Sequence, residues 1–210
     1  MKSGIIFSCK MLMFSSRDVL IRKHASMTAP TTSAILRDAK LRPAVAIGDV
    51  RRFWDENICG AYLVGHRKST RSDFEAYDEY RYRREFHLPG MIDSLPVDGR
   101  RVLEIGLGMG ADAARIARRA RSYVGVDLTW AAADTVRRRF RAFRLNGATG
   151  VADAESLPFP SSSFDIVFSH GALHHTPNFD GALREVARVL RPGGAFVVMV
   201  YHRNSFNYYL

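Results

Sequence analysis

Short apolar runs alternate with segments of helical periodicity over the second half of the chain. Strands of a parallel sheet are buried on both faces, so they read as nearly continuous apolar runs separated by helices. The alternation therefore predicts an α/β fold with an open, mainly parallel sheet and helices on both faces. The expected strands are residues 102–106, 122–128, 148–152, 164–169 and 195–201.

Two of the intervening segments carry a clear helical stripe. After Thr129, a suitable N-cap, apolar side chains recur at three- and four-residue spacing. These side chains are Trp130, Ala133, Val136, Phe140 and Phe143. The arginines of the segment lie mostly off the stripe and are expected to face solvent: Arg137, Arg138, Arg141 and Arg144. A second helix is expected from Asp180 to Leu190, ending at the run Arg191-Pro192-Gly193-Gly194.

The first 92 residues divide into two parts of different composition. Residues 1–49 show no sustained periodicity and are rich in Ser, Thr, Lys and Arg, which predicts a basic, poorly ordered extension. Residues 50–92 are aromatic and charged, which predicts a helical cap that ends near Leu88-Pro89-Gly90. The aromatic stripe of this cap is Phe74, Tyr77 and Tyr80. Residues 93–210 are expected to form the α/β core.

The net charge of +10 is concentrated in two stretches. Residues 101–150 hold ten Lys and Arg against four Asp and Glu, and residues 1–60 hold ten against five. Such stretches suit either a nucleic-acid surface or solvated helix faces. The second interpretation is favoured, because no RNA-binding motif or interleaved aromatic pattern accompanies the arginines. Nucleic acid is therefore not expected as a partner.

Cysteine usage and hydropathy suggest a reducing, aqueous compartment. Cys9 and Cys59 lie far apart and have no further ligand at metal spacing, so neither a disulfide framework nor a metal site is expected. The longest N-terminal apolar stretch, residues 5–14, is broken by Lys10 and is too short for a membrane span. We therefore expect a cytoplasmic protein without a membrane span.

The first strand of the series runs into a glycine-rich turn at Gly106, Gly108 and Gly110. Glycines at such a turn let the backbone approach a ligand closely. The same letters fit a dinucleotide-binding turn, with Asp127 as the ribose ligand. Glu104 helps to separate the two interpretations, because a carboxylate two residues before the first glycine would repel a pyrophosphate and attract a cationic ligand.

Two further acidic residues follow the next two strands. Asp127 is placed to accept hydrogen bonds from both hydroxyls of a ribose; a role as helix cap is less favoured, because Thr129 already supplies a cap. Asp153 could accept the amino group of an adenine, and the N–H of Ala154 could reach a ring nitrogen. Strand ends of an open parallel sheet share one crevice, so these acids should converge there, with Leu128 beside the adenine.

Four ordered stretches resemble the class I methyltransferases of the type 11 group, which includes quinone-biosynthesis C-methyltransferases. They are VLEIGLGMGADAARIA, YVGVDLT, GVADAESLPFPSSSFDIVFSHGALHHTP and LREVARVLRPGGAFVVMVYHRNS. The resemblance covers about half of the chain and implies a Rossmann-like sheet that binds S-adenosylmethionine, whose ammonium and sulfonium groups suit the acidic crevice. It also implies that the aromatic cap, which includes Phe53-Trp54, closes over this cofactor.

Further site residues are expected around the cofactor. The phenol of Tyr80 and the guanidinium of Arg81 are expected to meet its carboxylate, and Ser169 at the end of the fourth strand completes the set. His174 and His175 lie where the methyl acceptor should approach, so either could act as a general base, or both could only shape the loop. Methyl transfer from a sulfonium is an in-line displacement and requires no covalent nucleophile.

The motifs favour S-adenosylmethionine-dependent methyl transfer to a small-molecule acceptor, and two alternatives stay open. An NAD-dependent oxidoreductase would use the same glycine turn but would leave Glu104 and Asp153 unexplained. A non-catalytic protein could bind the cofactor for structure or regulation. The acceptor itself is not specified, because acceptor pockets on this fold come from variable loops.

Class I methyltransferases usually have seven strands, and the apolar runs account for five. Only residues 203–210 follow the fifth strand, too few for a final helix and an antiparallel hairpin. The C-terminal hairpin is therefore expected to be missing. One edge of the strand at 195–201 would then lack a partner, which predicts weak cofactor binding, impaired catalysis or self-association through that edge.

Overall fold

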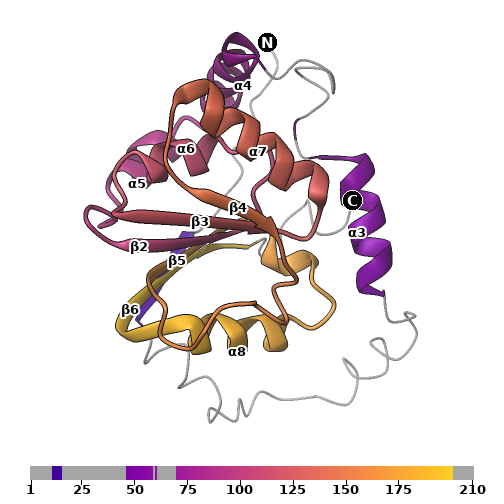
Figure 1. The fold of residues 1–210 in the computed structure, drawn as a ribbon, viewed down its shortest axis with the longest axis vertical. Coiled ribbons are helices and arrows are strands. Elements are labelled where there is room, and N and C mark those ends of the chain that lie inside the picture. Colours follow the sequence, from indigo (N-terminus) through magenta and orange to yellow (C-terminus); the bar gives the residue numbers. More distant parts are fainter. Residues whose placement is uncertain (1–10, 16–45, 59, 61–69, 201–210) are drawn as a thin grey trace, which may run out of the picture.

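The computed structural model describes four parts of the chain: residues 11–15, 46–58, 60 and 70–200. They form one six-stranded sheet in the order β1-β6-β5-β2-β3-β4, with helices on both faces (Figure 1). Cys9, Cys59 and residues 203–210, which the sequence analysis considered, lie outside the described residues. Within the described ranges, no helix is both long and apolar enough to cross a bilayer.

Five strands of the sheet are parallel, which confirms the alternation read from the sequence. Their bounds are β2 (Arg101–Ile105), β3 (Ser122–Asp127), β4 (Ala148–Val151), β5 (Phe164–His170) and β6 (Leu190–Met199). β2 lies in the middle and pairs with both β3 and β5. The strand order therefore reverses beside β2, and in open parallel sheets ligands bind at the carboxyl end of such a switch point.

Helices from the intervening segments cover the two faces of the sheet. α6 (Ala111–Ala117) and α7 (Trp130–Phe143) pack on one face, and α8 (Phe179–Val189) packs on the other (Figure 1). Successive residues of a strand point to opposite faces, so each face has its own apolar core. Within β2, Val102 belongs to the core under α6 and α7, and Leu103 belongs to the core under α8.

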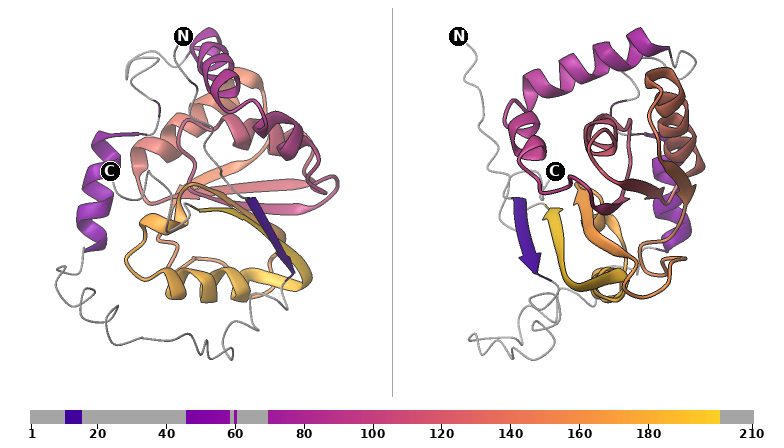
Figure 2. Two further views of the ribbon diagram at one scale, coloured as in Figure 1. Left: turned by 180° about the vertical axis from the view of Figure 1, so that it is seen from behind. Right: turned by 60° about the vertical axis from the view of Figure 1, so that its left-hand side comes forward.

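The expected cap consists of three separate helices: α3 (Ile47–Glu56), α4 (Arg71–Arg84) and α5 (Leu88–Asp93). α4 runs across α6 and α7 (Figure 2). Its residues Phe74 and Tyr77 are buried as predicted, whereas Tyr80 is half-buried. The Leu88-Pro89-Gly90 run begins α5 instead of ending a helix, because proline is well tolerated in a first helical turn.

One residue of the α7 stripe differs from the prediction, and Arg139, for which the sequence carried no prediction, is buried. Trp130 is 61% exposed, because it stands in the first turn, where its ring faces the guanidinium of Arg137 instead of the core. Arg139 is completely buried, since its guanidinium pairs with Asp78 of α4 and lies over the ring of Phe74. In the remainder of the stripe, Ala133, Val136 and Phe140 are buried and Phe143 is half-buried, and the expected N-cap Thr129 is present.

The edge of β6 that was expected to be open has a partner in the structure. β1 (Met11–Ser15), from the N-terminal extension, pairs antiparallel with β6 from Met199 to Ala195. The prediction of an unpaired edge is therefore wrong, because β1 supplies backbone partners along five residues of β6. β6 also begins earlier than expected, at Leu190, and residues 191–194 form an irregularity in its pairing with β5.

Candidate active site

The glycine-rich turn lies between the carboxyl end of β2 and the start of α6. Gly106, Gly108 and Gly110 have φ angles of +86°, +48° and +74°, which side chains of L-residues disfavour. A Cβ at Gly106 would stand 2.1 Å from the Cβ of Ala172. The turn therefore packs directly against the loop that follows β5, and the two loops of the switch point are in contact.

Asp127, at the end of β3, binds both the glycine turn and the start of α7. Its Oδ2 accepts a hydrogen bond from the N–H of Leu107 at 2.7 Å. Its Oδ1 accepts hydrogen bonds from the N–H and the hydroxyl of Thr129, at 2.9 and 2.8 Å. The carboxylate thus holds Thr129, which is itself the N-cap of α7 as expected. Each carboxylate oxygen can accept two hydrogen bonds, so Oδ2 retains capacity for a ligand hydroxyl.

Asp153 lies at the same edge of the sheet as Asp127. The N–H of Ala152 donates to the backbone carbonyl of Asp127 at 2.9 Å, which joins the ends of β3 and β4. Asp153 is half-buried, and its Oδ1 accepts from the N–H of Glu155 at 2.9 Å. Ala154 and Leu128 are also half-buried at this edge. The structure therefore brings the expected adenine and ribose positions together.

Ser169 differs from the expectation. Its side chain is completely buried, and its hydroxyl donates to the carbonyl of Ile105 at 2.9 Å. This hydrogen bond holds β5 against β2 below the glycine turn. The expected contact between Ser169 and the cofactor is therefore not supported, because the hydroxyl is used inside the sheet.

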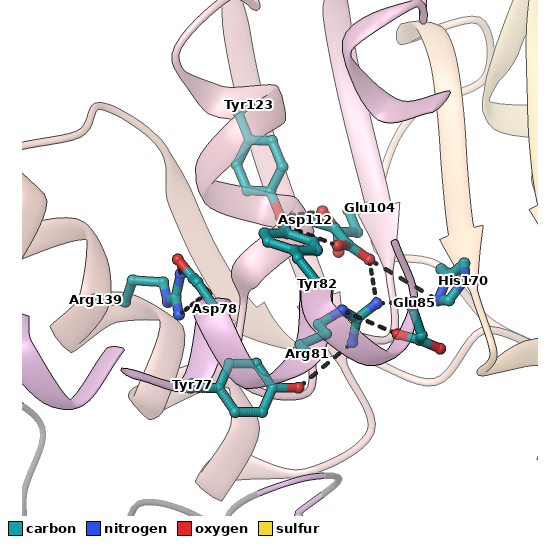
Figure 3. A network of polar contacts seen from close by, with 10 residues as sticks. All are labelled: Tyr77, Asp78, Arg81, Tyr82, Glu85, Glu104, Asp112, Tyr123, Arg139 and His170. Atoms are coloured by element: carbon teal, nitrogen blue, oxygen red, sulfur yellow. Dashed lines mark hydrogen bonds and ion pairs between the residues drawn. The ribbon is translucent and has the colours of Figure 1, made fainter. Parts of the chain in front are cut away.

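Glu104 lies inside a buried cluster of polar side chains (Figure 3). It is 2% exposed, and its Oε2 accepts a hydrogen bond from the hydroxyl of Tyr123 at 2.8 Å. Burial, together with the nearby carboxylate of Asp112, raises the pKa of Glu104 well above its ordinary value. The side chain therefore tends to hold a proton, and a cationic ligand at this place would favour its charged form.

Arg81 of α4 reaches into the same cluster, whereas Tyr80 does not. The guanidinium of Arg81 donates to Asp112 at 2.7 Å, and its Nη2 lies 3.3 Å from Nδ1 of His170 (Figure 3). Burial opposes the charge of Arg81, but Asp112 and two further neighbours outweigh burial and raise the pKa of the guanidinium. The hydroxyl of Tyr80 accepts a hydrogen bond from Arg84 instead. Only Arg81 of this expected pair is therefore placed beside the glycine turn.

His174 and His175 belong to the short 3-10 helix η2 (Leu173–His175), which follows β5. The ring of His175 lies 4.9 Å from that of Trp54 in α3 and 4.1 Å from that of His174. Burial, with a smaller effect of His175, lowers the pKa of His174 to about 4. Burial also lowers the pKa of His175. Both imidazoles are therefore uncharged near neutral pH and can accept a proton.

Several residues of the polar cluster received no role from the sequence, among them Asp112, Tyr123 and His170. The hydrogen bonds of Arg81 to Asp112 and His170 span 31 and 89 positions, so no local pattern connects them. The sequence contained one indication that Asp112 belongs to the site. Asp112 stands in the first turn of α6, two residues after Gly110, where the helix dipole favours a carboxylate.

A glycine turn at the switch point of a parallel sheet, followed by acids after the next two strands, defines a class of protein. It is the class I S-adenosylmethionine-dependent methyltransferases. Comparison with known families agrees, since residues 103–198 match the methyltransferase domain family Methyltransf_11. Residues 103–198 of this chain therefore match a methyltransferase domain, and the class of methyltransferases that the site resembles uses S-adenosylmethionine as its cofactor. The match favours this conclusion over the NAD-dependent alternative.

Two curated relatives and one solved structure show how far the similarity extends. A fatty-acid O-methyltransferase from Mycolicibacterium smegmatis is 46% identical over 103 residues, which are 48% of this chain and 37% of that protein. A phthiotriol/phenolphthiotriol dimycocerosates methyltransferase from Mycobacterium tuberculosis is 43% identical over 100 residues, 47% of this chain and 36% of that protein. The chain thus matches little more than a third of each relative's length.

The solved structure supports the fold. The geranyl diphosphate C-methyltransferase from Streptomyces coelicolor A3(2) aligns with a TM-score of 0.56 at 20% identity, over 76% of this chain and 66% of that chain. At this level of identity the likeness concerns the arrangement of strands and helices. It agrees with the five parallel strands and their covering helices.

Proposed function

We propose that this chain transfers the methyl group of S-adenosylmethionine to an oxygen atom of an apolar small molecule. The observation that supports this acceptor class is an aromatic cluster formed by Trp54, His174 and His175. Its loop packs on the glycine turn through Ala172 and Gly106, so the cluster lies close to the cofactor position. Similarity to a relative named as a fatty-acid O-methyltransferase points in the same direction.

The residues around the switch point fit the cofactor. The backbone of the glycine turn is open to close approach, Oδ2 of Asp127 can accept a further hydrogen bond, and Glu104 can become charged beside a cation. S-adenosylmethionine supplies a methyl group that its sulfonium has already activated. The protein's own contribution is to hold the acceptor in line and to exclude water, and such positioning can lower a barrier by ~7 to 11 kcal/mol.

The acceptor side combines apolar surface with a neutral base. Phe53 of α3 is 56% exposed and its ring lies 5.1 Å from that of Trp54, which offers apolar surface to an acyl chain. Phe179 begins α8, the helix that packs on η2, and is 37% exposed. If the acceptor is an alcohol, His175 can take the hydroxyl proton as the oxygen attacks. A carboxylic acid is already ionised near neutral pH and needs no base.

The experiment compares a fatty acid with the fatty alcohol of the same chain length. The purified chain is incubated with S-adenosylmethionine and either acceptor, and methyl ester or methyl ether is measured by mass spectrometry. His175→Asn should slow methylation of the alcohol by about 100-fold and leave methylation of the acid nearly unchanged, because only the alcohol must lose a proton. His174→Asn is the matched control, since a pKa of about 4 makes His174 a weak base.

Calorimetry with S-adenosylhomocysteine separates the two parts of the proposal. Asp127→Ala should weaken binding by more than about tenfold, whereas Thr129→Val, which removes a neighbour of the carboxylate but keeps Asp127, should have a smaller effect. Tight binding without product from either acceptor would reject the acceptor class. Unchanged affinity in Asp127→Ala would reject the assigned cofactor position.

We further propose that residues 50–92 act as the cap of this site. α3 contacts η2 through Trp54 and His175, and α4 places Arg81 beside Asp112 at the start of α6, so the cap borders the crevice on two sides. Limited proteolysis with and without saturating S-adenosylhomocysteine tests this role. Cleavage within the segment should slow when the ligand is present; an unaltered cleavage pattern would mean that the segment does not close over the cofactor.

A further inference from the structure

A second concave site lies at the opposite end of the sheet from the cofactor crevice. It is a groove of about 470 Å³ between the carboxyl ends of α6 and α7 and the amino ends of β3 and β4. Its lining includes Ser122, the first residue of β3, whereas Asp127 of the cofactor site is the last residue of that strand. The five steps from Ser122 to Asp127 span about 17 Å, so the groove and the ribose position lie at opposite ends of β3. The buried Tyr123, whose hydroxyl donates to Glu104, lies between them.

Three exposed arginines give the groove its character: Arg118, Arg121 and Arg144. None of them forms an ion pair with a carboxylate of the described residues, and no acidic residue lines the groove. Asp98, whose backbone bridges to the lining residue Ala120, already pairs with Arg119. Many other arginines of the described ranges are paired, as Arg115 is with Asp93. Some, such as Arg51 and Arg184, also form no ion pair with a described carboxylate, but Arg118, Arg121 and Arg144 share one groove.

The backbone around the groove does not cancel this charge. Two helices point their carboxyl ends toward it, and each end carries roughly −0.5 of a charge. The three guanidinium groups together carry three positive charges. The sum of these charges and the two helix ends is a net charge of about +2 in the groove. Arg118 is also held in place, because its guanidinium lies 5.6 Å from the centre of the Phe143 ring. That contact occupies one face of the guanidinium and leaves its edge free to donate hydrogen bonds.

We propose that the groove lined by Arg118, Arg121 and Arg144 binds the phosphate group of a soluble small molecule. Guanidinium groups are well suited to phosphate, since their N–H donors match its oxygens in pairs. The volume falls within the range of small-molecule sites. Single-stranded nucleic acid is disfavoured, because the aromatic lining residue, Tyr123, is buried and offers no stacking surface. A membrane surface is disfavoured, because no large exposed apolar side chain lines the groove.

The first test measures binding of inorganic pyrophosphate by calorimetry. The double variant Arg118→Gln/Arg121→Gln should lose about tenfold or more in affinity, as expected for the loss of charge-assisted hydrogen bonds. The matched control is Arg51→Gln/Arg184→Gln, which removes the same charge from exposed arginines of α3 and α8 that form no ion pair with a carboxylate of the described residues. Its affinity for pyrophosphate should stay within about twofold of the parent chain. Equal losses in both double variants would overturn the proposal, because they would show a response to net charge alone.

Further titrations identify which kind of molecule carries the phosphate, and a second variant controls for misfolding. Vesicles containing phosphatidylserine and a poly-uridine oligonucleotide are titrated under the same conditions. Binding to either that depends on Arg118 and Arg121, with no saturable binding of pyrophosphate, would overturn the proposal of a soluble ligand. Arg144→Asn provides a second variant, because asparagine tolerates the left-handed backbone of this position, at φ +54°. Affinity for S-adenosylhomocysteine should be unchanged in Arg118→Gln/Arg121→Gln and in Arg144→Asn, since these arginines lie outside the cofactor site.

Discussion

Glu104→Gln should make the protein more stable at neutral pH while it weakens the cofactor site. The substitution keeps the shape of the side chain and an oxygen that can accept the hydrogen bond of Tyr123, so the packing around it is preserved. It removes the carboxylate whose pKa burial and Asp112 raise well above the ordinary value. In the parent chain, folding therefore favours the protonated form of Glu104.

The sign and the size of the effect follow from this linkage. A raised pKa in the folded state adds stability below the pKa of the unfolded chain, and that stability is lost as the pH rises through the folded pKa. Within this window the parent chain should lose up to about 1.4 kcal/mol per pH unit relative to Glu104→Gln. For a domain of this size, each kcal/mol corresponds to roughly 2 to 4 °C in the thermal midpoint. The variant should therefore melt several degrees higher at about pH 8 and show no advantage at about pH 4.

Thermal melts and denaturant titrations across this pH range provide the measurement, and Asp165→Asn provides a control of opposite sign. Burial raises the pKa of Asp165, but hydrogen bonds from Arg101 and the charge of Arg191 outweigh burial and lower it. That substitution should therefore destabilise the protein at neutral pH. If the curves of the parent chain and Glu104→Gln run parallel between about pH 4 and pH 8, the raised pKa of Glu104 is refuted.

The same variant tests the role of Glu104 in the site. The ammonium of S-adenosylhomocysteine should be held better as Glu104 becomes charged, so the affinity of the parent chain should rise with pH. In Glu104→Gln this rise should be absent, and binding at about pH 8 should be about tenfold weaker. A variant that is more stable and still binds as tightly would show that the carboxylate does not contact the cofactor.

Three further predictions concern the framework of the site. Gly106→Ala should abolish binding of S-adenosylhomocysteine, because its Cβ would stand 2.1 Å from another Cβ, whereas Gly99→Ala, at φ +68° with open space around it, should cost only stability; equal losses of binding would contradict this reasoning. Asp78→Asn should lower the free energy of unfolding by about 3 kcal/mol in denaturant titrations, because it leaves the charge of Arg139 buried without its partner; a loss below about 1 kcal/mol would contradict it. Deletion of residues 1–15 removes β1 and should expose the edge of β6, so light scattering should detect oligomers; a monomer that melts no lower than the parent chain would show that β1 is dispensable.

Local patterns predicted the parallel sheet because the central strands β2 and β5 are buried on both faces and therefore read as continuous apolar runs. The runs at 102–106 and 122–128 fall within one residue of β2 and β3, and Thr129 caps α7 as its position indicated. The glycine turn and the acids Asp127 and Asp153 were also predictable. They follow directly on strands, so their position at the carboxyl edge needs no knowledge of the packing.

Residues whose role depends on distant partners were predicted less well. Ser169 has the sequence position of a ligand contact, but its hydroxyl points into the sheet and bonds to Ile105. Arg139 resembles its exposed neighbours in the sequence, yet it is buried because it pairs with Asp78 of α4. The two residues are 61 positions apart, so no local pattern connects them. The spacing of arginines along a helix predicts which face of the helix they share. It does not predict which of them meets a carboxylate of another element in the folded protein.

The sequence by itself determined the class of fold, the glycine turn, the acids at the strand ends and the methyltransferase family, because each depends on neighbours a few residues apart. Only the tertiary structure decided the remainder. It paired Met11–Ser15 with β6, joined Arg81 to Asp112 and His170, and gathered three unpaired arginines around one groove. These contacts connect residues far apart in the chain, and their stability comes from burial and charge pairing that exist only after the sheet and its helices have assembled.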